Sequence, residues 1–377
     1  MKKIFWCVQQ LDKIGGTEMV TIDIMNHLCD YYDITLICTS KISGPIQYEL
    51  NPKLKVVCLN VPNDIARFDE YKRIYNEKHQ YFKTLGLIWR TLYYFIFHRH
   101  HYRKLNKNRM CKDDLYIASS LDSYDYAPKG RNVYFHFHFD EDIFNSKSMQ
   151  LYLGYFRKPD KYIFLTKGCY DEVIKKHKKL KDNSVYIYNP IRFPPTLNLD
   201  YHNNSIMFCG RFHPQKDPLF ALSIANVLHE RDFEFTLNMY GSGSLEDKMK
   251  SYINEHHLEN NVVLHPMSKD IEKAYLSNDL LLISSTYEGC PLIRGEATAF
   301  SMPFVSTNWG VAAKELCNEG MDGFVIDKRN AVDFANKIME IFADKDKLKL
   351  LKRSAFEESK KYSYDSIIPI WRNDILK

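Results

Sequence analysis

The chain has 377 residues, of which 45% are hydrophobic and 15 are glycines, so it is neither disordered nor fibrous and is long enough for two domains. The sequence contains no run of about 20 apolar residues, which excludes a membrane-spanning helix, and the apolar start at residues 4–8 is too short for a signal peptide. Nine scattered cysteines without a Cys-x-x-Cys pair exclude the commonest zinc and redox motifs. These features together favour a cytosolic protein.

The net charge of +5 is unevenly distributed along the chain. Residues 72–112 contain eleven Lys or Arg and one acid, Glu77, which gives this segment a charge of +10 and leaves −5 for the remainder. Aromatic residues are interleaved with the basic ones, and apolar residues recur at helical spacing. Two interpretations stay open: packed helices with a solvated basic face, or an interfacial helix pair on anionic lipid. The concentrated charge favours the membrane surface as the partner, and the segment has no nucleic-acid motif.

The first half of the chain alternates expected strands and helices. A strand over residues 3–9 precedes Gly15 and Gly16, which let the backbone approach a ligand closely. These glycines open a helix that should run to about residue 31, with Thr17 as its cap. Further helices are expected near residues 145–157 and 168–179. Further strands are expected at residues 33–38, 54–59, 114–118, 132–139, 161–166 and 184–188.

Two histidines and three acidic residues follow one another at the end of the strand over residues 132–139. His136 and His138 lie two residues apart, so on a strand they face the same way. Taken alone, such a pair is more typical of satisfied structural histidines than of a functional site. Asp140 and Asp142 have the Asp-x-Asp form of some manganese sites, but three acids after a strand are more typical of a helix N-terminus. A helix N-terminus is therefore the favoured interpretation, and a metal site stays open at this point.

The second half repeats the alternation after a linker predicted at residues 193–204. The apolar run from Leu281 to Ile283 indicates a buried strand, followed by a polar loop and a helix with Pro291 in its first turn. Such a junction points backbone N–H groups at the carboxyl edge of a sheet, where anions and nucleotides bind. Glu288 and Glu296 stand at its two ends. The strands expected in this half lie at residues 205–209, 233–239, 261–265, 279–284, 303–306 and 323–326, which predicts a second doubly wound domain.

Several short motifs, in order along the chain, resemble those of the glycosyltransferases of family 4. Gly210 and Arg211, followed by Lys216 and Asp217, are similar to the Gly-Arg and Lys-Asp pattern of that family. Glu288 and Glu296, with seven residues between them, resemble its paired glutamates. Weaker resemblances are the glycine loop Gly15-Gly16-Thr17-Glu18, the interdomain turn Asn189-Pro190, the glycine turn Tyr240-Gly241-Ser242-Gly243 and a tail with Tyr362 and Trp371.

The resemblance implies an α/β protein with the GT-B fold, in which two doubly wound Rossmann-like domains face each other across a cleft. On this basis we expect an acceptor-binding domain over residues 1–190 and a nucleotide-sugar-binding domain over residues 191–360. The tail at residues 361–377 is expected to cross back and pack on the first domain.

The resemblance also implies roles for individual residues. Glu288 would accept hydrogen bonds from the donor sugar, and His138 or His136 would contact the same sugar from the first domain; the spacing to Asp140 favours His138. Arg211 and Lys216 can hold a diphosphate, the guanidinium by paired hydrogen bonds and the ammonium as a point charge. The expected donor-binding residues are Gly15, Gly16, Arg211, Lys216, Gly241, Cys290, Pro291, Leu292, Ile293 and Glu296, of which Glu296 would bind the ribose hydroxyls.

The reaction implied is retaining transfer, in which the acceptor attacks from the face that the diphosphate leaves. No enzymatic nucleophile, metal or cofactor is expected, because Arg and Lys neutralise the leaving group. Two departures from the family pattern are Arg294 with Gly295 before the second glutamate, and His265 in place of a glycine near the nucleotide base. The second leaves the base open.

We therefore expect a glycosyltransferase that moves a hexose or N-acetylhexosamine from a nucleotide diphosphate sugar, with UDP favoured, to a cell-envelope glycan or its lipid carrier. It would act in the cytoplasm, at the inner face of the membrane if residues 72–112 bind lipid. The alternative is a glycan-binding or assembly subunit that keeps the fold with little activity. The sugar, the acceptor and the oligomeric state do not follow from the sequence, because fold alone does not determine substrate.

Overall fold

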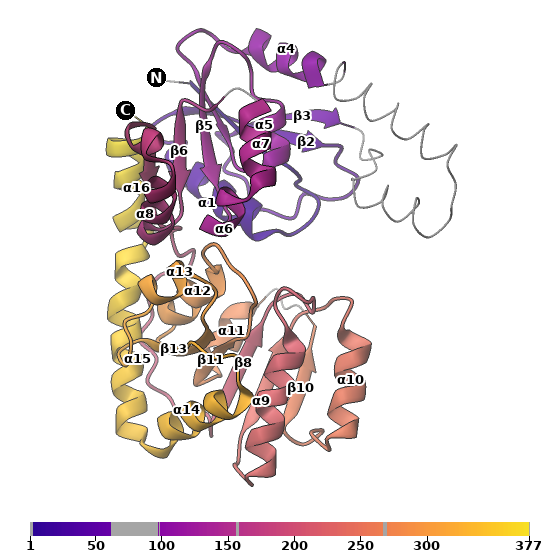
Figure 1. The fold of residues 1–377 in the computed structure, drawn as a ribbon, viewed down its shortest axis with the longest axis vertical. Helices are drawn as coiled ribbons and strands as arrows, with labels where there is room; N and C mark the ends of the chain where they lie inside the picture. The colour runs from indigo at the N-terminus through magenta and orange to yellow at the C-terminus, as the bar shows by residue number, and fades with distance from the viewer. Residues whose placement is uncertain (1–2, 62–96, 98, 156–157, 267–269, 377) are drawn as a thin grey trace, which may run out of the picture. The chain divides into compact units, whose positions relative to one another are not determined.

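The computed structural model describes residues 3–61, 97, 99–155, 158–266 and 270–376, and its order of elements is shown in Figure 1. These residues form two compact units. The first comprises residues 1–138, 146–164 and 177–185, and the second comprises residues 139–145, 165–176 and 186–377. The predicted boundary at residues 190 and 191 and the predicted packing of the tail on the first domain stay predictions. The tail itself groups with the second unit.

The first unit is built on a seven-stranded sheet in the order β3-β2-β1-β4-β5-β6-β7. The pairs from β3 to β6 are all parallel, and each predicted strand of this half is present. Chain order reverses between β1 and β4, which is the position where such sheets bind ligands at their carboxyl ends. The strands are β1 (Lys3–Val8), β2 (Asp33–Ser40), β3 (Lys55–Val61), β4 (Leu115–Ala118), β5 (Asn132–Phe137), β6 (Lys161–Phe164) and β7 (Ser184–Tyr186).

The helices of the first unit connect these strands. The sequence of α1 places apolar residues four apart on one face of the helix, and these residues, Val20, Ile24 and Leu28, are all buried. The helix ends three residues earlier than predicted. The helices are α1 (Gly16–Leu28), α4 (Arg99–Arg109), α5 (Leu121–Asp125), α7 (Lys147–Tyr155) and a 3-10 turn at Lys178–Asn183.

The second unit contains a six-stranded sheet in the order β10-β9-β8-β11-β12-β13, and every pair in it is parallel. Chain order reverses between β8 and β11. All six predicted strands are present, with β9 shifted by one to three residues. They are β8 (Ser205–Cys209), β9 (Thr236–Tyr240), β10 (Val262–His265), β11 (Leu280–Ile283), β12 (Phe304–Thr307) and β13 (Gly323–Ile326).

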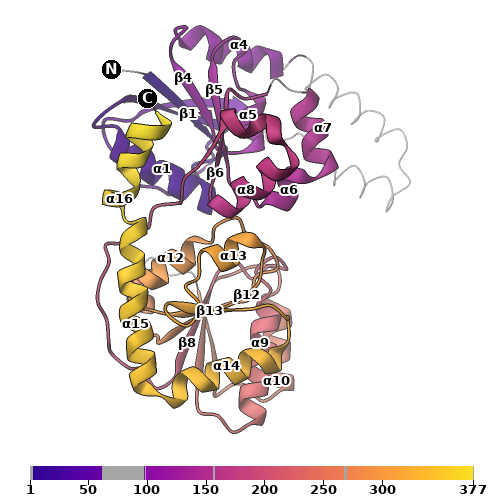
Figure 2. The ribbon, with the colours of Figure 1, turned by 60° about the vertical axis from the view of Figure 1, so that its left-hand side comes forward.

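Alternate residues of the central strands serve two different hydrophobic cores. In β8 and β11, Ile206 and Leu282 pack on the side of α9, α10 and α14, whereas Met207 and Leu281 pack on the side of α11, α12 and α13. In Figure 2, α12 and α13 lie on the opposite side of the strands from α9, α10 and α14. Because both faces are covered, the strands are apolar throughout, as expected for a buried parallel sheet. This confirms the predicted doubly wound arrangement of the second half.

The helices of the second unit include two short segments from the first half of the sequence, α6 and α8. They belong here because they contact α13: the Glu315 carboxylate accepts from the backbone N–H groups of Lys167 at 2.8 Å and Gly168 at 2.5 Å, at the start of α8. The helices are α6 (Glu141–Asn145), α8 (Lys167–Lys176), α9 (Pro218–Glu230), α10 (Glu246–Glu255), α11 (Ile271–Leu276), α12 (Leu292–Ala299), α13 (Val311–Glu315), α14 (Ala331–Ala343), α15 (Lys345–Ser359) and α16 (Tyr364–Ile370).

The end of the chain is buried although it follows the last strand. Tyr362, Trp371 and Ile375 are at most 9% exposed, and the Tyr362 carbonyl accepts from the N–H of Ile191 at 2.7 Å. Among the described residues, no helix is both long and apolar enough to cross a bilayer.

Candidate functional site

Two loops meet at the carboxyl edge of the second sheet, where the chain order reverses. One follows β8 and runs from Gly210 to Asp217, and the other follows β11 and runs from Ser284 to Pro291. Thr286 N donates to the carbonyl of Gln215 at 2.8 Å, and the Ser284 hydroxyl bonds the carbonyls of Lys216 at 2.8 Å and Asp217 at 2.9 Å. These contacts hold the two loops together at their bases.

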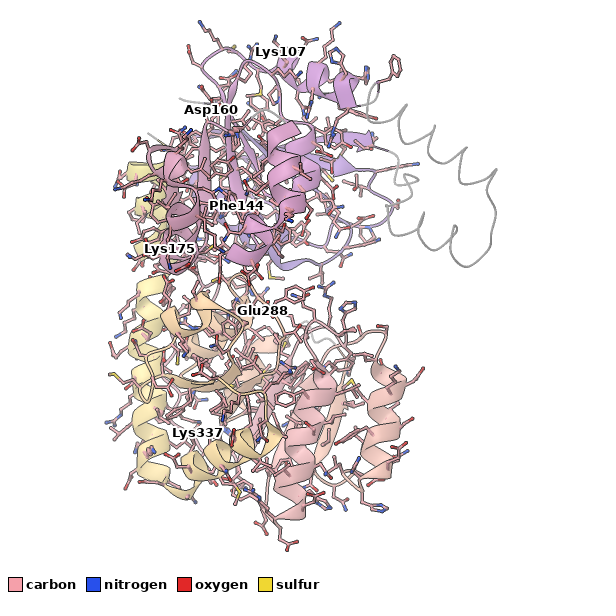
Figure 3. All side chains as sticks on the ribbon, viewed as in Figure 1. Lys107, Phe144, Asp160, Lys175, Glu288 and Lys337 are labelled. Carbon is pink, nitrogen blue, oxygen red and sulfur yellow. The ribbon has the colours of Figure 1, made fainter. Side chains whose placement is uncertain are left out.

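An ion pair joins the two loops above these backbone contacts. Lys216 Nζ lies 2.5 Å from Glu288 Oε1, and the Ser285 hydroxyl donates to the same oxygen at 2.6 Å. The side chains of Lys216 and Glu288 are 17% and 8% exposed, so the pair is largely shielded from water. The structure thus brings together two of the residues predicted to hold the donor. Ser285 was not predicted as a residue of the site. Figure 3 labels Glu288 on its loop.

Arg211 lies on the same loop as Lys216 but is exposed. Its Nη2 lies 3.3 Å from the Gln215 side-chain oxygen, an acceptor on its own loop. The guanidinium therefore has few fixed contacts, whereas Lys216 is held in place by Glu288. The predicted role of Arg211 at a diphosphate stays a prediction.

The helix α12 begins directly after the second loop and carries the second predicted glutamate. Pro291 is its N-cap, so the proline precedes the first turn instead of lying within it as predicted. Glu296 is buried within the helix, where its Oε2 accepts from the Tyr275 hydroxyl at 2.7 Å and its Oε1 lies 3.5 Å from Arg192 Nε. Tyr275 and Arg192 were not predicted as part of the site. Burial and the nearby carboxylate raise the pKa of Tyr275 well above its ordinary value, so its hydroxyl is a donor.

Cys290 stands at the junction between the loop and α12. Burial raises the pKa of its thiol to about 11, so the sulfur is neutral at physiological pH. A neutral thiol does not repel an anion bound nearby. The backbone N–H groups at the start of α12 follow Cys290 directly in the chain.

The two departures from the family pattern in α12 have structural causes. Arg294 is 3% exposed and donates from Nε to the carbonyl of Leu316 at 2.8 Å, with Asp322 at 3.9 Å and the Tyr362 ring 4.9 Å from its Cζ. A Cβ added at Gly295 would lie 2.9 Å from Ile191 Cγ1, so glycine permits the chain at Ile191 to approach the helix closely. Arg294 thus contacts the tail at Tyr362, and Gly295 leaves room for Ile191.

Glycines bring the loops after β8 and β9 into contact. A Cβ on Gly241 would lie 2.0 Å from the carbonyl oxygen of Gly210, and one on Gly243 would lie 2.4 Å from that of Phe212. The predicted glycine turn is therefore required by close backbone packing. Any contact of Gly241 with a ligand stays a prediction.

His265 stacks on Tyr240 at the carboxyl ends of β10 and β9, with ring centroids 4.4 Å apart and an interplanar angle of 10°. Its Nε2 lies 2.9 Å from Asn238 Oδ1. The orientation of that amide follows from Asn278, whose Nδ2 donates to the Ala274 carbonyl and whose Oδ1 accepts from Asn238 Nδ2 at 2.9 Å. Nε2 is therefore the protonated nitrogen, and Nδ1 is left as an acceptor. Burial lowers the pKa of His265, which keeps the ring neutral.

In the first unit, the predicted glycine loop follows β1 at the reversal of chain order. Gly15 is the N-cap of α1, so the prediction that Thr17 caps this helix is wrong; the helix already begins at Gly16. Gly15 N donates to the Tyr48 hydroxyl at 2.9 Å, and a Cβ at Gly15 would lie 2.4 Å from Glu18 Oε2. The Glu18 side chain thus folds back into the space beside Gly15.

His136 and His138 are adjacent, as the strand spacing predicted. His138 Nε2 lies 3.1 Å from His136 Nδ1, and the Trp6 ring lies against His136. Burial lowers the pKa of His138 to about 3, and burial with the neighbouring ring lowers the pKa of His136 well below its ordinary value. Both imidazoles are therefore neutral at physiological pH, and each can accept or donate a hydrogen bond without carrying charge.

The acidic run after β5 forms helix contacts. Asp140 Oδ1 accepts from the N–H of Ile143 at 2.8 Å, and Glu141 Oε1 lies 3.4 Å from the N–H of Val311 at the start of α13. Within the part of the chain that the structure describes, His, Cys, Asp and Glu form no group of three or more that could hold a metal ion.

The basic segment at residues 72–112 lies partly outside the described residues, which include only residues 97 and 99–112 of it. Within α4, Arg99 is 3% exposed and forms an ion pair with Asp125, while Arg103 Nε donates to the Asp125 carbonyl at 2.7 Å. These two residues hold the C-terminal end of α5, so they are not part of a solvated basic face. Lys104 and Lys107 are exposed, and Figure 3 labels Lys107 at the margin of this unit.

Comparison with known proteins gives an independent view of the chain. Residues 192–358 match the family model of the glycosyl transferases group 1. An uncharacterized glycosyltransferase of Haemophilus influenzae is 24% identical over 381 residues, which cover 99% of each chain. A Campylobacter jejuni α-1,4-N-acetyl-D-galactosaminyltransferase, named for a diNAcBac-PP-undecaprenol-linked substrate, is 22% identical over 387 residues and covers 98% of this chain and 97% of its own.

A solved structure supports the fold in the same way. The complex of an S. aureus TarM mutant with fondaparinux, α-GlcNAc-glycerol and UDP has a TM-score of 0.77 at 17% sequence identity, with 99% of both chains covered. The two parallel sheets and their order agree with this likeness, so the predicted GT-B fold is confirmed. Membership of glycosyltransferase family 4 stays a prediction. The chain is thus a GT-B-fold protein whose residues 192–358 match the model of the glycosyl transferases group 1.

Proposed function

We propose that this protein is a retaining glycosyltransferase that moves a hexose or N-acetylhexosamine from a UDP-sugar to a cell-envelope glycan or its lipid carrier. The observation that carries the proposal is the shielded pair of Lys216 and Glu288, at the reversal of chain order and beside the start of α12. A cation, a carboxylate and unpaired helix N–H groups at one sheet edge are the complement of a diphosphate bonded to a sugar.

In this proposal Lys216 binds the diphosphate, and Arg211 closes on it from the exposed side of the same loop. Two phosphate groups offer several oxygens, so the partly buried ammonium and the exposed guanidinium can bind without displacing each other. The start of α12, near Leu292 and Ile293, adds the field of the helix terminus, worth about 1 to 2 kcal/mol for a partly buried anion.

The two glutamates would bind the two ends of the donor. Glu288 releases Lys216 to the phosphate and accepts from the sugar hydroxyls, while Ser285 keeps its carboxylate oriented. Glu296 would accept from the ribose hydroxyls, oriented by Tyr275 and Arg192. A carboxylate has about four acceptor positions, so these existing contacts leave capacity for a ligand.

The proposed reaction uses the leaving diphosphate as the base that takes the acceptor's proton, on the face where the bond to phosphate breaks. The sugar then keeps its anomeric configuration, and no enzymatic nucleophile or metal takes part. The name of the Campylobacter jejuni relative specifies an α-linked product, which supports retention if its donor sugar is α-linked. We assign the neutral rings of His138 and His136 to hydrogen bonding with the donor sugar, on the family resemblance.

Incubation with a panel of UDP-sugars and an envelope lipid extract tests the proposal, with release of free UDP as the readout. We expect release with one or a few of the sugars, and a loss of at least 100-fold in turnover for Lys216→Ala and Glu288→Ala. Turnover that both substitutions leave unchanged would refute the assignment. UDP binding without turnover would favour the alternative, a glycan-binding or assembly subunit.

We also propose peripheral binding to anionic membrane through the basic segment, supported in the described residues by the exposed Lys104 and Lys107 and by Phe97, which is 60% exposed. Charge reversal of Lys104 and Lys107 should weaken sedimentation with anionic vesicles, and salt should weaken it further. Arg99 and Arg103 are unsuitable for this test, because their loss would disturb the end of α5 at Asp125. Binding that survives charge reversal and 0.5 M salt would refute this proposal.

A further inference from the structure

Arg329 follows β13 and reaches the bases of both loops that form the candidate site. Its Nη2 donates to Asp217 Oδ2 at 2.5 Å and to the Ser284 carbonyl at 2.8 Å, and its Nη1 lies 3.3 Å from the Ser285 carbonyl. The guanidinium also lies over the Phe220 ring, with Cζ 4.4 Å from the centroid. One side chain therefore contacts the loop after β8, the loop after β11 and the first turn of α9.

The contact of Arg329 with the first loop lies directly next to Lys216 of the proposed donor site. Asp217 follows Lys216 and has a left-handed backbone with φ of 42°, a conformation that costs a non-glycine residue about 1 kcal/mol or more. Its Oδ1 accepts from Phe220 N at the start of α9, and its Oδ2 accepts from Arg329. The side chain of Asp217 is thus occupied at both oxygens, which fixes the direction in which Lys216 leaves the loop.

The contacts with the second loop act on Glu288 in the same manner. Arg329 holds the carbonyls of Ser284 and Ser285, and the Ser285 hydroxyl holds Glu288 Oε1 at 2.6 Å. The Ser285 carbonyl also accepts from the Thr307 hydroxyl at 2.6 Å, so the end of β11 is supported from two sides.

We infer that Arg329 is a positioning residue, which keeps Lys216 and Glu288 at the separation that a diphosphate sugar requires. The inference rests on the proposed function. Arg329 acts through its contacts with Asp217, Ser284 and Ser285 and does not touch the substrate.

The chemistry of the contact requires a guanidinium. Three acceptors, two of them backbone carbonyls on one strand end and one a carboxylate on the other loop, match the planar fork of arginine. A lysine at this position could reach one or two of them with its single nitrogen. The Arg329 side chain is 34% exposed, so its removal opens no large cavity.

A double-mutant cycle on UDP binding tests this inference by isothermal titration calorimetry. We expect Arg329→Met to weaken UDP binding by about tenfold and Arg329→Lys to weaken it by about threefold, within the range found for contacting residues. Asp217→Asn, which keeps the helix-capping acceptor but removes the charge, should resemble the Lys variant. Arg353→Met removes an exposed arginine from α15 of the same unit and should leave UDP binding unchanged.

The decisive comparison uses the Lys216→Ala background. If Arg329 acts by positioning Lys216 and Glu288, Arg329→Met should cost less than about threefold in UDP affinity once Lys216 is absent. A full tenfold loss in that background, or no loss in the wild-type background, would overturn the positioning role while leaving the proposed function intact. UDP affinity that Lys216→Ala itself does not change would overturn both.

Melting temperatures distinguish positioning from loss of folding. Arg329→Lys and Arg353→Met should melt within a few degrees of the wild type. In the variants that fold, kcat/KM for the donor should fall while KM for the acceptor stays constant. A parallel loss for donor and acceptor in the Arg329→Lys variant would indicate general disruption and contradict the inference.

Discussion

The ion pair between Lys216 and Glu288 leads to a prediction in which binding and turnover change in opposite directions. In the structure the Lys216 ammonium is bonded to the carboxylate of Glu288, at 2.5 Å. A diphosphate that binds Lys216 must replace this contact and bring its own negative charge close to Glu288. Glu288→Gln keeps the shape and the hydrogen bond from Ser285 but removes the competing charge. We therefore expect this variant to bind free UDP more tightly than the wild type does.

The magnitude follows from the geometry and the shielding of the pair. A carboxylate about 5 Å from one phosphate charge is repelled by about 3 kcal/mol at an effective dielectric constant of about 20. Rotation of the side chain and counterions reduce this value, so we expect about half of it, which corresponds to roughly tenfold in UDP affinity. Transfer should fall by about 100-fold, because the carboxylate no longer accepts from the sugar as charge develops in the transition state.

Calorimetric titration with UDP at fixed ionic strength, together with the UDP-release assay, measures both effects. Glu272→Gln is the matched control, since Glu272 is an exposed glutamate on α11 of the same unit and its loss changes the net charge equally. The gain in affinity for Glu288→Gln should shrink as salt is raised, because it is electrostatic. Unchanged or weaker UDP binding by Glu288→Gln, or an equal gain for Glu272→Gln, would refute the reasoning.

Three further predictions concern stability. Gly295→Ala should lower the melting temperature by several degrees, because the new Cβ would lie 2.9 Å from Ile191 Cγ1. The decrease should be smaller in an Ile191→Ala background, and equal decreases in both backgrounds would contradict the close approach. Arg294→Met should cost about 3 kcal/mol in urea unfolding, since the buried Leu316 carbonyl loses its donor and the buried Asp322 carboxylate loses its neighbouring cation; a cost below about 1 kcal/mol would contradict this. The folded-state pKa values of His136 and His138 lie below the unfolded value of 6.5, so the unfolded chain binds protons first and stability falls as the pH drops from about 6.5 towards 3. The loss is at most about 1.4 kcal/mol per pH unit for each ring, and His138→Asn should flatten the melting-temperature profile between pH 7 and 5; an unchanged slope would contradict the buried neutral pair.

Sequence patterns predicted the strands of both sheets because each buried strand is a short apolar run between polar turns. The residues from Leu280 to Ile283 are apolar because both faces of the sheet are covered by helices, and a run of that kind is visible without any structure. Helix ends were predicted less well. Thr17 is a better capping residue than Gly15 by preference, yet the helix begins at Gly16, so Thr17 already lies inside its first turn.

Residues of the candidate site could be predicted only where they belong to a recognisable sequence motif. Lys216 and Glu288 belong to recognisable motifs, and the pairing of β8 with β11 in a parallel sheet brings their loops together. Tyr275 and Arg329 belong to no motif, because they reach the site from the end of α11 and from the loop after β13. A tyrosine or arginine at such positions has no sequence signal that distinguishes it from an ordinary surface residue.

Arg294, a departure from the family pattern, shows why some buried contacts could not be predicted. It is unusual before the second glutamate, and the sequence offers no partner for it within a helical turn. Its partners are the Leu316 carbonyl, Asp322 and the Tyr362 ring, which are distant in sequence and meet only in the folded unit. Burial raises the pKa of Asp322 to about 6, so the effect of burial on this carboxylate is larger than the opposing effect of the Arg294 charge.

The central claim is that Lys216 recognises a diphosphate, and comparison of UDP with UMP in the same titration tests it most directly. The two ligands share the base, the ribose and one phosphate, so their difference in affinity measures the contacts of the second phosphate. We expect wild-type protein to bind UDP at least tenfold more tightly than UMP, and Lys216→Ala to reduce this ratio to about two, because a charge-assisted contact of this type contributes about 1.5 to 3 kcal/mol. Equal affinities for UDP and UMP in the wild type, or a ratio that Lys216→Ala leaves unchanged, would contradict the claim.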